Sequence, residues 1–317
     1  MTASRIDIIN RVKYSDTGSN LKRQVFILAK VKLLTDSSAD LTDELYQRYD
    51  IFVVPFYVTF DKQTYYKERV EISSAEFYKK LRSEKVYPST SLPSTGDYEE
   101  AFRAYLDQGM DVVCICLTSK FSGSYQNAAS TAENIKGEYP DRVIRVIDSI
   151  QAACGQGLVV LQAALMARDG LGANEIADRI DRLKETARVF FTVDSLTYLQ
   201  KGGRIGKVSA LAGTILNIKP IIVMRDAELN PINKVRGWYN ALEKVISLVG
   251  EYVGSERDEY EYILIDADCR DEAGKVVEKM KQQGYKIELP IMDLGITIGS
   301  HTGPMLVGVC MIKKYKA

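Results

Sequence analysis

The 317-residue chain contains a single histidine, His301, within the sequence GSHTGP at residues 299–304. An imidazole titrates near neutral pH and can donate to or pair with an anionic group, and neighbouring glycines allow a close backbone approach. Most isolated histidines are ordinary core or surface residues. His301 therefore indicates a binding site only if other polar groups gather around it.

Three loops rich in hydroxyl groups are candidates to gather there: TDSSADL (35–41), STSLPSTGD (89–97) and TSKFSGSYQNA (118–128). Hydroxyls at the start of a helix commonly act as N-caps, which is the structural interpretation of Ser37 or Thr95. In open α/β sheets, however, ligands bind beyond the carboxyl ends of the strands, where loops of this kind lie.

The third loop has a second property that favours anion binding. Ser122, Gly123 and Ser124 precede a predicted helix that runs to about Ile135. Backbone N–H groups and hydroxyls at the start of a helix attract negative charge, and the helix dipole adds to this attraction. The loop therefore predicts a seat for a carboxylate or a phosphate, although each serine alone could be only an N-cap.

A glycine-rich turn, LQKGGRIG at 199–206, supplies a permanent positive charge in Arg204. The turn is not an ATP-binding phosphate loop, because that motif requires glycine where Lys201 stands and a hydroxyl where Val208 stands. We therefore interpret Arg204 either as a solvated loop residue or as a partner for an anion, and we expect no ATP site of this type.

Nucleophilic hydrolysis is an alternative that the residue types permit. Ser122, His301 and an aspartate such as Asp36 or Asp148 could be drawn as a triad. The sequence has no G-x-S-x-G elbow, and any chain of this length contains a serine, a histidine and an aspartate. We therefore rank hydrolysis below binding.

Composition argues against several classes of partner. The chain carries 42 basic and 42 acidic residues, so no net charge attracts it to nucleic acid or to an anionic membrane. Its five cysteines form no C-x-x-C pair, which argues against a zinc site or a disulfide framework and favours a reducing compartment. We find neither a membrane-length apolar run nor the apolar core of a signal peptide, so we expect a cytoplasmic protein. We also expect that the protein uses no metal and no cofactor.

From Val31 onward, β-rich runs alternate with amphipathic segments, the pattern of an α/β fold. DVVCICLT and RVIRVIDS predict parallel strands buried on both faces. Helices are expected over 73–81 with a capping box, and over 95–108, 125–135, 157–167 and 174–187. Later strands are expected in RVFFTVDS, KPIIVM, EYILIDAD, YKIELPIM and MLVGVCMIKK.

This order of elements divides the chain into two domains. The N-terminal α/β domain is expected at residues 31–180 and carries the hydroxyl-rich loops, and the C-terminal α/β domain is expected at 181–317. Residues 1–30 lack clear periodicity, and we interpret them as an N-terminal extension outside the fold.

Eight ordered motifs between residues 31 and 317 resemble the DegV family, bacterial fatty-acid-binding proteins that serve as binding subunits of fatty acid kinase. The motifs are TDSSADL, TSLPSTGDY, TSKFSGSYQNA, VIDS, YLQKGGRIG, KPII, KVRG with Trp238, and IGSHTGP. The resemblance implies a two-domain α/β fold, with a parallel sheet in the N-terminal domain and a mixed sheet in the C-terminal domain. It also implies a buried apolar tunnel for a long-chain fatty acid of about 16 or 18 carbons, with the carboxylate in a polar pocket near the domain junction.

Carried onto this sequence, the resemblance implies individual roles. Thr90 and Ser122 look like the hydroxyls that hydrogen-bond the carboxylate, and His301 and Arg204 look like the basic groups near the headgroup and the kinase-facing surface. The implied ligand-binding residues are Thr90, Ser91, Ser122, Gly123, His301 and Thr302, with Arg204 adjacent to the headgroup or the partner. The implied partner is an ATP-dependent fatty acid kinase, with transient contact with the membrane from which the fatty acid is extracted.

Two positions depart from the family pattern. Leu92 stands where relatives commonly have glutamine, and Met305 stands where the last motif commonly continues with glycine. Neither change removes an implied carboxylate contact, but both bear on the shape of the pocket. The fold also resembles the substrate-binding half of dihydroxyacetone kinase, so a subunit that binds a small carbonyl compound is the alternative, favoured if the pocket is too small for an acyl tail.

Overall fold

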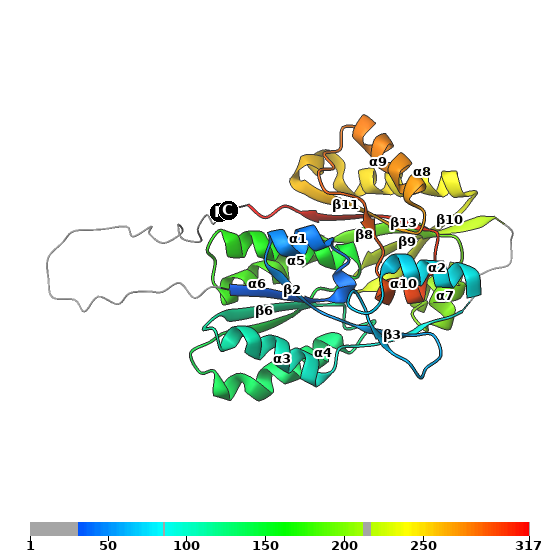
Figure 1. The fold of residues 1–317 in the computed structure, drawn as a ribbon. Coiled ribbons are helices and arrows are strands. Elements are labelled where there is room, and N and C mark those ends of the chain that lie inside the picture. Colours follow the sequence, from blue (N-terminus) through cyan, green and yellow to red (C-terminus); the bar gives the residue numbers. More distant parts are fainter. Residues whose placement is uncertain (1–30, 85, 212–216, 317) are drawn as a thin grey trace, which may run out of the picture.

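The computed structural model describes residues 31–84, 86–211 and 217–316. Two main β-sheets organise this part of the chain, with helices between and outside them (Figure 1). The first described strand begins at Val31, where the sequence pattern places the first element. The predicted N-terminal extension, residues 1–30, lies outside the described residues.

The first sheet is parallel, with the strand order β2, β1, β6, β7. Its strands are β1 (Val31–Asp36), β2 (Ile51–Val54), β6 (Asp111–Cys116) and β7 (Ile144–Asp148). β6 lies inside the sheet and is buried along its whole length, as its continuous apolar sequence predicts.

β7 differs from the prediction in its burial. It lies at the edge of the sheet, and only Ile147 among its residues is fully buried. The expectation that RVIRVIDS is buried on both faces is therefore wrong, because an edge strand keeps one side partly open to solvent.

Helices cover both faces of this sheet. α3 (Thr95–Leu106) and α4 (Ser124–Ile135) pack together on one face, where aromatic and aliphatic side chains form a separate core. α1 (Asp43–Arg48), α5 (Cys154–Arg168) and α6 (Ala173–Leu183) lie on the other face (Figure 1).

α5 lies between the two main sheets. It contacts β1 and β6 of the first sheet and also β11 (Tyr260–Ala267) and β13 (Leu306–Lys313) of the second. Nearly all of its residues are buried, which explains why its sequence is apolar on every side rather than amphipathic. The helix begins three residues before the predicted start at residue 157.

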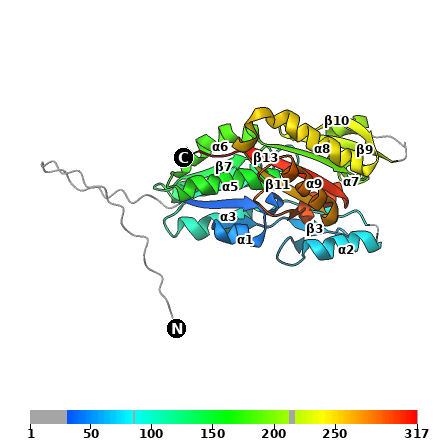
Figure 2. The same cartoon turned by 90° about the horizontal axis from the view of Figure 1, so that it is seen from above.

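The second sheet is mixed, with the strand order β10, β9, β8, β13, β11, β12. The bounds of its remaining strands are β8 (Arg188–Val193), β9 (Ile218–Arg225), β10 (Glu228–Arg236) and β12 (Met292–Asp293). All neighbours run antiparallel except β11 and β12. α8 (Trp238–Val253) and α9 (Arg270–Gln282) pack on its outer face, seen from above in Figure 2.

The predicted strand YKIELPIM is mostly wrong. Only its last residue, Met292, belongs to a strand, β12, which lies at the sheet edge. Tyr285 and Ile287 are nevertheless buried, because they pack into the core beneath α8 and α9. Pro290 has no N–H group to donate, so the segment is poorly suited to a β-ladder.

A small third sheet contributes to the site. β3 (Tyr57–Thr59) pairs with β4 (Tyr66–Lys67) and with β5 (Ser89–Ser91), all antiparallel. α10 (Ile296–Thr302), from the end of the chain, packs against β3, β5 and α7 (Thr197–Lys201). α2 (Ser74–Glu84) follows β4 and begins with the predicted capping box between Ser73 and Glu76.

Short 3₁₀ helices complete the described elements: Ser37–Ala39, Lys136–Glu138, Lys184–Thr186, Gly206–Leu211 and Gly254–Glu259. The strands of the parallel sheet fall within residues 31–180 and those of the mixed sheet within 181–317, and we retain a domain boundary near residue 180 as a proposal.

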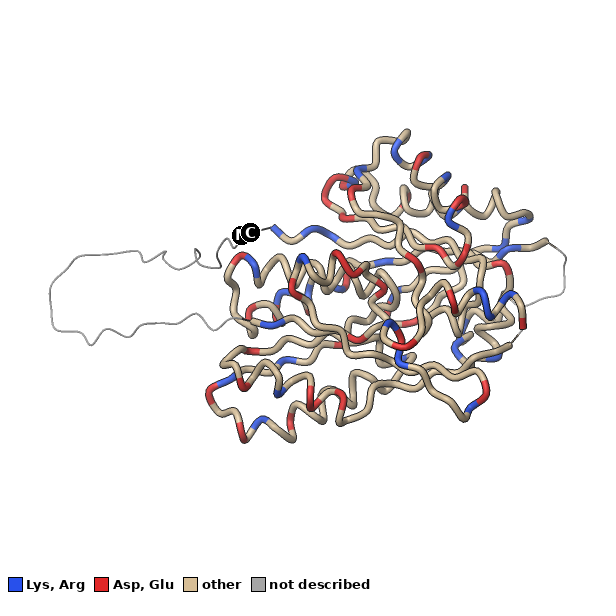
Figure 3. Tube along the Cα trace, viewed as in Figure 1, with Lys and Arg blue, Asp and Glu red and all other residues tan. Residues whose placement is uncertain are grey.

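Basic and acidic residues are interspersed over the described chain (Figure 3). Its helices include none with both the length and the apolar composition needed to cross a bilayer.

Candidate functional site

A cavity of about 450 Å³ lies where elements of all three sheets meet. Strands of the second sheet form one wall of its apolar lining, with Val189, Phe191, Met224, Leu229, Ile265 and Leu306. This volume and this mainly apolar lining are typical of pockets that bind small molecules.

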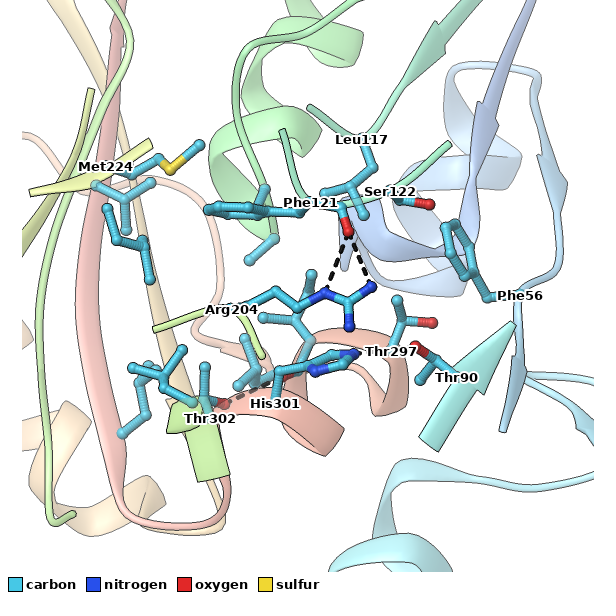
Figure 4. Close-up of a pocket in the computed structure, with 18 of the residues that line it drawn as sticks. Phe56, Thr90, Leu117, Phe121, Ser122, Arg204, Met224, Thr297, His301 and Thr302 are labelled. Carbon is cyan, nitrogen blue, oxygen red and sulfur yellow. Dashed lines mark hydrogen bonds between the residues drawn. The ribbon is translucent and has the colours of Figure 1, made fainter. Parts of the chain in front are cut away.

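All seven residues singled out from the sequence line this one cavity, on four separate segments. Thr90 and Ser91 belong to β5, Ser122 and Gly123 precede α4, His301 and Thr302 end α10, and Arg204 follows α7. Figure 4 shows several of these polar side chains grouped around Arg204. Ser91, Gly123 and Arg204 are exposed, so the polar end of the cavity opens to the surface.

His301 is held between two segments. Its Nε2 lies 3.0 Å from Oγ1 of Thr90. Its Nδ1 faces Gly202 so closely that a Cβ atom on that glycine would lie 2.3 Å away. Burial, and secondarily the charge of Arg204, lower the pKa of His301 to about 4. At neutral pH the ring is therefore uncharged and can donate or accept one hydrogen bond at Nε2, depending on its tautomer.

Arg204 connects the loop at residues 118–128 with the glycine-rich turn at 199–206 through hydrogen bonds. Its Nε and Nη2 each donate to the carbonyl oxygen of Phe121 at 3.2 Å, and its Nη1 donates to the carbonyl of Gly202 at 2.7 Å (Figure 4). The guanidinium therefore places a permanent positive charge at the polar end of the cavity, beside the ring of His301.

The loop that carries Ser122 is anchored from beneath by Asp36, at the end of β1. The Asp36 carboxylate accepts from the backbone N–H of Leu117 at 2.9 Å and from the hydroxyl of Ser124 at 2.8 Å. Gly123 is the N-cap of α4, and the hydroxyl of Ser122 accepts from the N–H of Ser124 at 3.2 Å. The start of α4 thus faces the cavity. The sequence pattern predicts an anion-binding site at this helix start.

The hydrolytic triad considered from the sequence is not assembled. His301 contacts Thr90, whereas Asp36 is occupied by the donors described above and by Ser38 and Gln156. Asp148 accepts from the backbone N–H groups at residues 119 and 150. Neither aspartate orients the imidazole, so the geometry that such catalysis requires is not formed by these residues.

Sequence reasoning missed the apolar lining and two α10 residues, Thr297 and Ile298. Apolar residues that line a cavity have the same types and spacing as residues of a filled core, so no pattern separates them. Thr297 and Ile298 lie one turn or less before His301 on a helix, and the spacing i, i+3 and i+4 could have identified them once that segment was assigned as helical.

The two-sheet α/β fold, with a mainly apolar cavity that ends in hydroxyls, an imidazole and a guanidinium, defines a small-molecule-binding protein. The family model that matches the chain is that of the DegV family, over residues 30–314. The chain belongs to the DegV family.

Individual relatives agree with this assignment. A DegV domain-containing protein of Caldanaerobacter subterraneus subsp. tengcongensis is 34% identical over 287 residues, which cover 90% of this chain and 100% of that protein.

Two solved structures also resemble the chain closely. A stearic acid-binding protein from Eubacterium ventriosum superposes with a TM-score of 0.85 at 33% identity, over 90% of this chain and 99% of that one. A DegV family protein from Thermus thermophilus, described by its fatty acid binding, superposes with a TM-score of 0.82 at 29% identity, again over 90% and 99%.

Proposed function

We propose that this protein binds a long-chain fatty acid, with the acyl chain in the apolar part of the cavity and the carboxylate at its polar end. The observation that carries this proposal is the division of the cavity into an apolar wall from the second sheet and a polar end that opens to the surface. The relatives from Eubacterium ventriosum and Thermus thermophilus, which bind fatty acids, support the choice of ligand.

The apolar wall supplies the larger part of the binding free energy. Burial of each methylene contributes about 0.8 kcal/mol, so a dozen methylenes contribute about 10 kcal/mol before the costs of association. A covalent link or a metal ion is therefore unnecessary to hold the ligand.

The polar end provides donors for the carboxylate. The proposed contacts are Thr90, Ser91, Ser122, Gly123, His301 and Thr302, with Arg204 beside them. A neutral His301 can donate through Nε2–H, and the Arg204 guanidinium favours a charged carboxylate over the carbonyl that it now binds.

We further propose that one carboxylate oxygen stays accessible to a partner, an ATP-dependent fatty acid kinase. In that reaction the oxygen attacks the γ-phosphorus of ATP, ADP leaves, and an acyl phosphate forms for use in phospholipid metabolism. The exposure of Arg204 and Ser91 at the opening supports this arrangement. The protein then acts as the lipid-binding subunit rather than as the enzyme, in the cytoplasm and with transient contact with a membrane.

The small-carbonyl alternative fits the cavity less well. A volume of about 450 Å³, with six apolar side chains from five strands of the second sheet, exceeds what a small polar compound would fill. We therefore favour the fatty acid.

Native mass spectrometry of the purified protein, followed by extraction of any bound molecule, tests the proposal first. A stoichiometric long-chain fatty acid is expected. Palmitate binding should weaken in Ser122→Ala and His301→Ala, whereas Ser83→Ala, on the exposed side of α2, serves as the control. A protein that remains empty and does not bind added palmitate would transfer the assignment to the small-carbonyl alternative.

A further inference from the structure

A buried carboxylate lies at the amino end of α10, outside the cavity. Glu68 is 2% exposed, and its Oε1 accepts from the backbone N–H groups of Ile296 at 2.5 Å and Thr297 at 3.0 Å. Its Oε2 accepts from the Thr297 hydroxyl at 2.6 Å. Glu68 therefore satisfies donors at the first turn of the helix that ends in His301 and Thr302.

The same carboxylate is joined to the opposite wall of the site. Its Oε2 also accepts from the hydroxyl of Ser37 at 2.5 Å, and that hydroxyl accepts from the N–H of Phe56 at 2.9 Å. The Glu68 N–H donates to the Phe56 carbonyl at 2.9 Å. Since Phe56 lines the cavity, one side chain connects the loop after β1, the segment between β2 and β3, and α10.

A second buried carboxyl group, Asp40, lies beside Glu68. A Cβ atom on Gly295 would lie 2.1 Å from Oδ1 of Asp40 and 2.9 Å from Oε1 of Glu68, which places these two oxygens within about 5 Å of each other. Neither oxygen of Asp40 has a hydrogen-bond partner within the described chain. Two buried carboxylates at this separation cannot both be charged without a large penalty.

The four donors on Glu68 decide which group keeps the charge. Hydrogen bonds stabilise the ionised form of a carboxylate, whereas an unpartnered buried carboxyl group favours its protonated form. Burial, followed by the charge of Glu68, raises the pKa of Asp40 well above its usual range. Burial also raises the pKa of Glu68, but its four hydrogen bonds oppose that rise. Asp40 is therefore the member of the pair that holds a proton more firmly, and Glu68 is the member that ionises first, next to the N–H groups of α10.

We propose that Glu68 is a positioning residue for the headgroup site, which fixes the amino end of α10 and thereby sets His301 and Thr302 at the cavity. Glu68 does not line the cavity, so it acts through the helix and not by contact with ligand. This inference rests on the proposed fatty-acid function for its effect on binding, but its effect on His301 is independent of any ligand.

Three substitutions separate positioning from general stability. Glu68→Ala removes every acceptor, Glu68→Asp withdraws the carboxylate by one methylene, and Glu68→Gln keeps the length and one acceptor oxygen for the helix N–H groups. Palmitate and hexadecanol each have a 16-carbon chain, but only palmitate has a carboxylate. We expect the ratio of their dissociation constants to shift against palmitate by about tenfold in Glu68→Ala, by about threefold in Glu68→Asp and by less in Glu68→Gln.

The second measurement uses the only histidine in the sequence, whose ring NMR signals are unambiguous in a protein without a tag. In the ligand-free wild type the ring should stay neutral down to a pH of about 4, and in Glu68→Ala its titration should move toward the ordinary value of 6.5. Asp40→Asn, which removes the neutral carboxyl group with little change of shape, should leave the titration in place.

These outcomes distinguish a failure of the proposed fatty-acid function from a failure of the positioning role of Glu68. If the wild type does not bind palmitate but the His301 titration shifts in the Glu68 variants, the proposed function fails and the positioning role stands. An unchanged His301 titration and an unchanged palmitate-to-hexadecanol ratio in folded Glu68→Ala overturn the inference. If Glu68→Ala is too unstable to purify, the same two readouts in Glu68→Asp decide the question.

Discussion

Thr90 and His301 lie 211 residues apart in the sequence, and the Thr90 Oγ1 and His301 Nε2 atoms are 3.0 Å apart in the fold. Thr90 belongs to the small third sheet, and His301 belongs to the last helix, which packs on that sheet. The polar end of the cavity therefore exists only when these two distant segments of the chain have folded together.

Replacement of Thr90 by valine keeps the side-chain shape and removes its hydroxyl. We expect palmitate to bind about fivefold more weakly, since a lost hydrogen bond costs about 1 kcal/mol and leaves His301 without its partner. Isothermal titration calorimetry measures the change. Thr131→Val is the matched control, because the Thr131 hydroxyl is buried and donates to the Asn127 carbonyl within α4. Equal losses in both variants would contradict a headgroup role for Thr90.

The buried imidazole predicts a pH dependence of stability. The pKa of His301 is about 4 in the folded protein and about 6.5 when unfolded, so the unfolded chain binds the proton first as pH falls. Stability is therefore lost between about pH 6.5 and about pH 4, by up to about 3 kcal/mol from this group. Urea unfolding at both ends of this pH range measures the loss of stability in the wild type and in His301→Gln, and the loss should be smaller in the variant. Parallel pH profiles would show that His301 does not titrate in this way.

Gly202 leaves room for the His301 ring. An added Cβ atom would lie 2.3 Å from Nδ1, although the φ of −76° at Gly202 is accessible to alanine. Gly202→Ala should therefore displace the ring without backbone strain, and weaken palmitate binding by about tenfold or more. Gly137→Ala, where an added Cβ meets no atom within 4 Å, controls for the change of residue type. Circular dichroism confirms that both variants are folded, and normal binding by Gly202→Ala would refute the steric argument.

Met224 lies across the cavity from Thr90 (Figure 4), and its side chain is almost fully buried. Met224→Trp should reduce the space for the acyl chain and move the preference toward shorter fatty acids, at a stability cost of about 1 to 3 kcal/mol. Competition binding with saturated fatty acids of increasing length measures the preference. The adjacent Val223 packs in the outer core, so Val223→Leu supplies a control for overpacking on the same strand. An unaltered length preference would exclude Met224 from the tail-binding wall.

Much of the site could be predicted because its chemistry lies in loops at the ends of strands. The loops with Ser122 and Arg204 carry hydroxyls, glycines and a cation that have no use in a core, so their composition indicates a ligand. The loop with Ser122 follows a parallel strand, β6, at the edge of the sheet where ligands commonly bind, whereas Arg204 follows β8 of the other sheet and is joined to the Ser122 loop by its hydrogen bonds to Phe121.

Other features depend on contacts that no local pattern encodes. Glu68 lies in a charged stretch, YYKERVEIS, that resembles a solvated turn, yet it is buried because α10 and Ser37 supply its donors. The cap of α3 is also displaced by one residue: Ser94, and not Thr95, forms the capping box with Asp97. In each case the deciding partner is a specific atom in space and not a residue type in sequence.

The part of the cavity wall that the second sheet forms belongs to the continuous hydrophobic cluster that joins the two main sheets, which contains Leu33 and Ile115 of one sheet and Val189 and Ile265 of the other. An unfilled apolar space at that junction costs stability, and a bound acyl chain restores the missing contacts. On the proposed function, the ligand-free chain unfolds more readily and is degraded faster by cellular proteases. The lifetime of the protein would then follow the supply of fatty acid, so that its abundance rises with the amount of ligand to be bound, without a dedicated sensor.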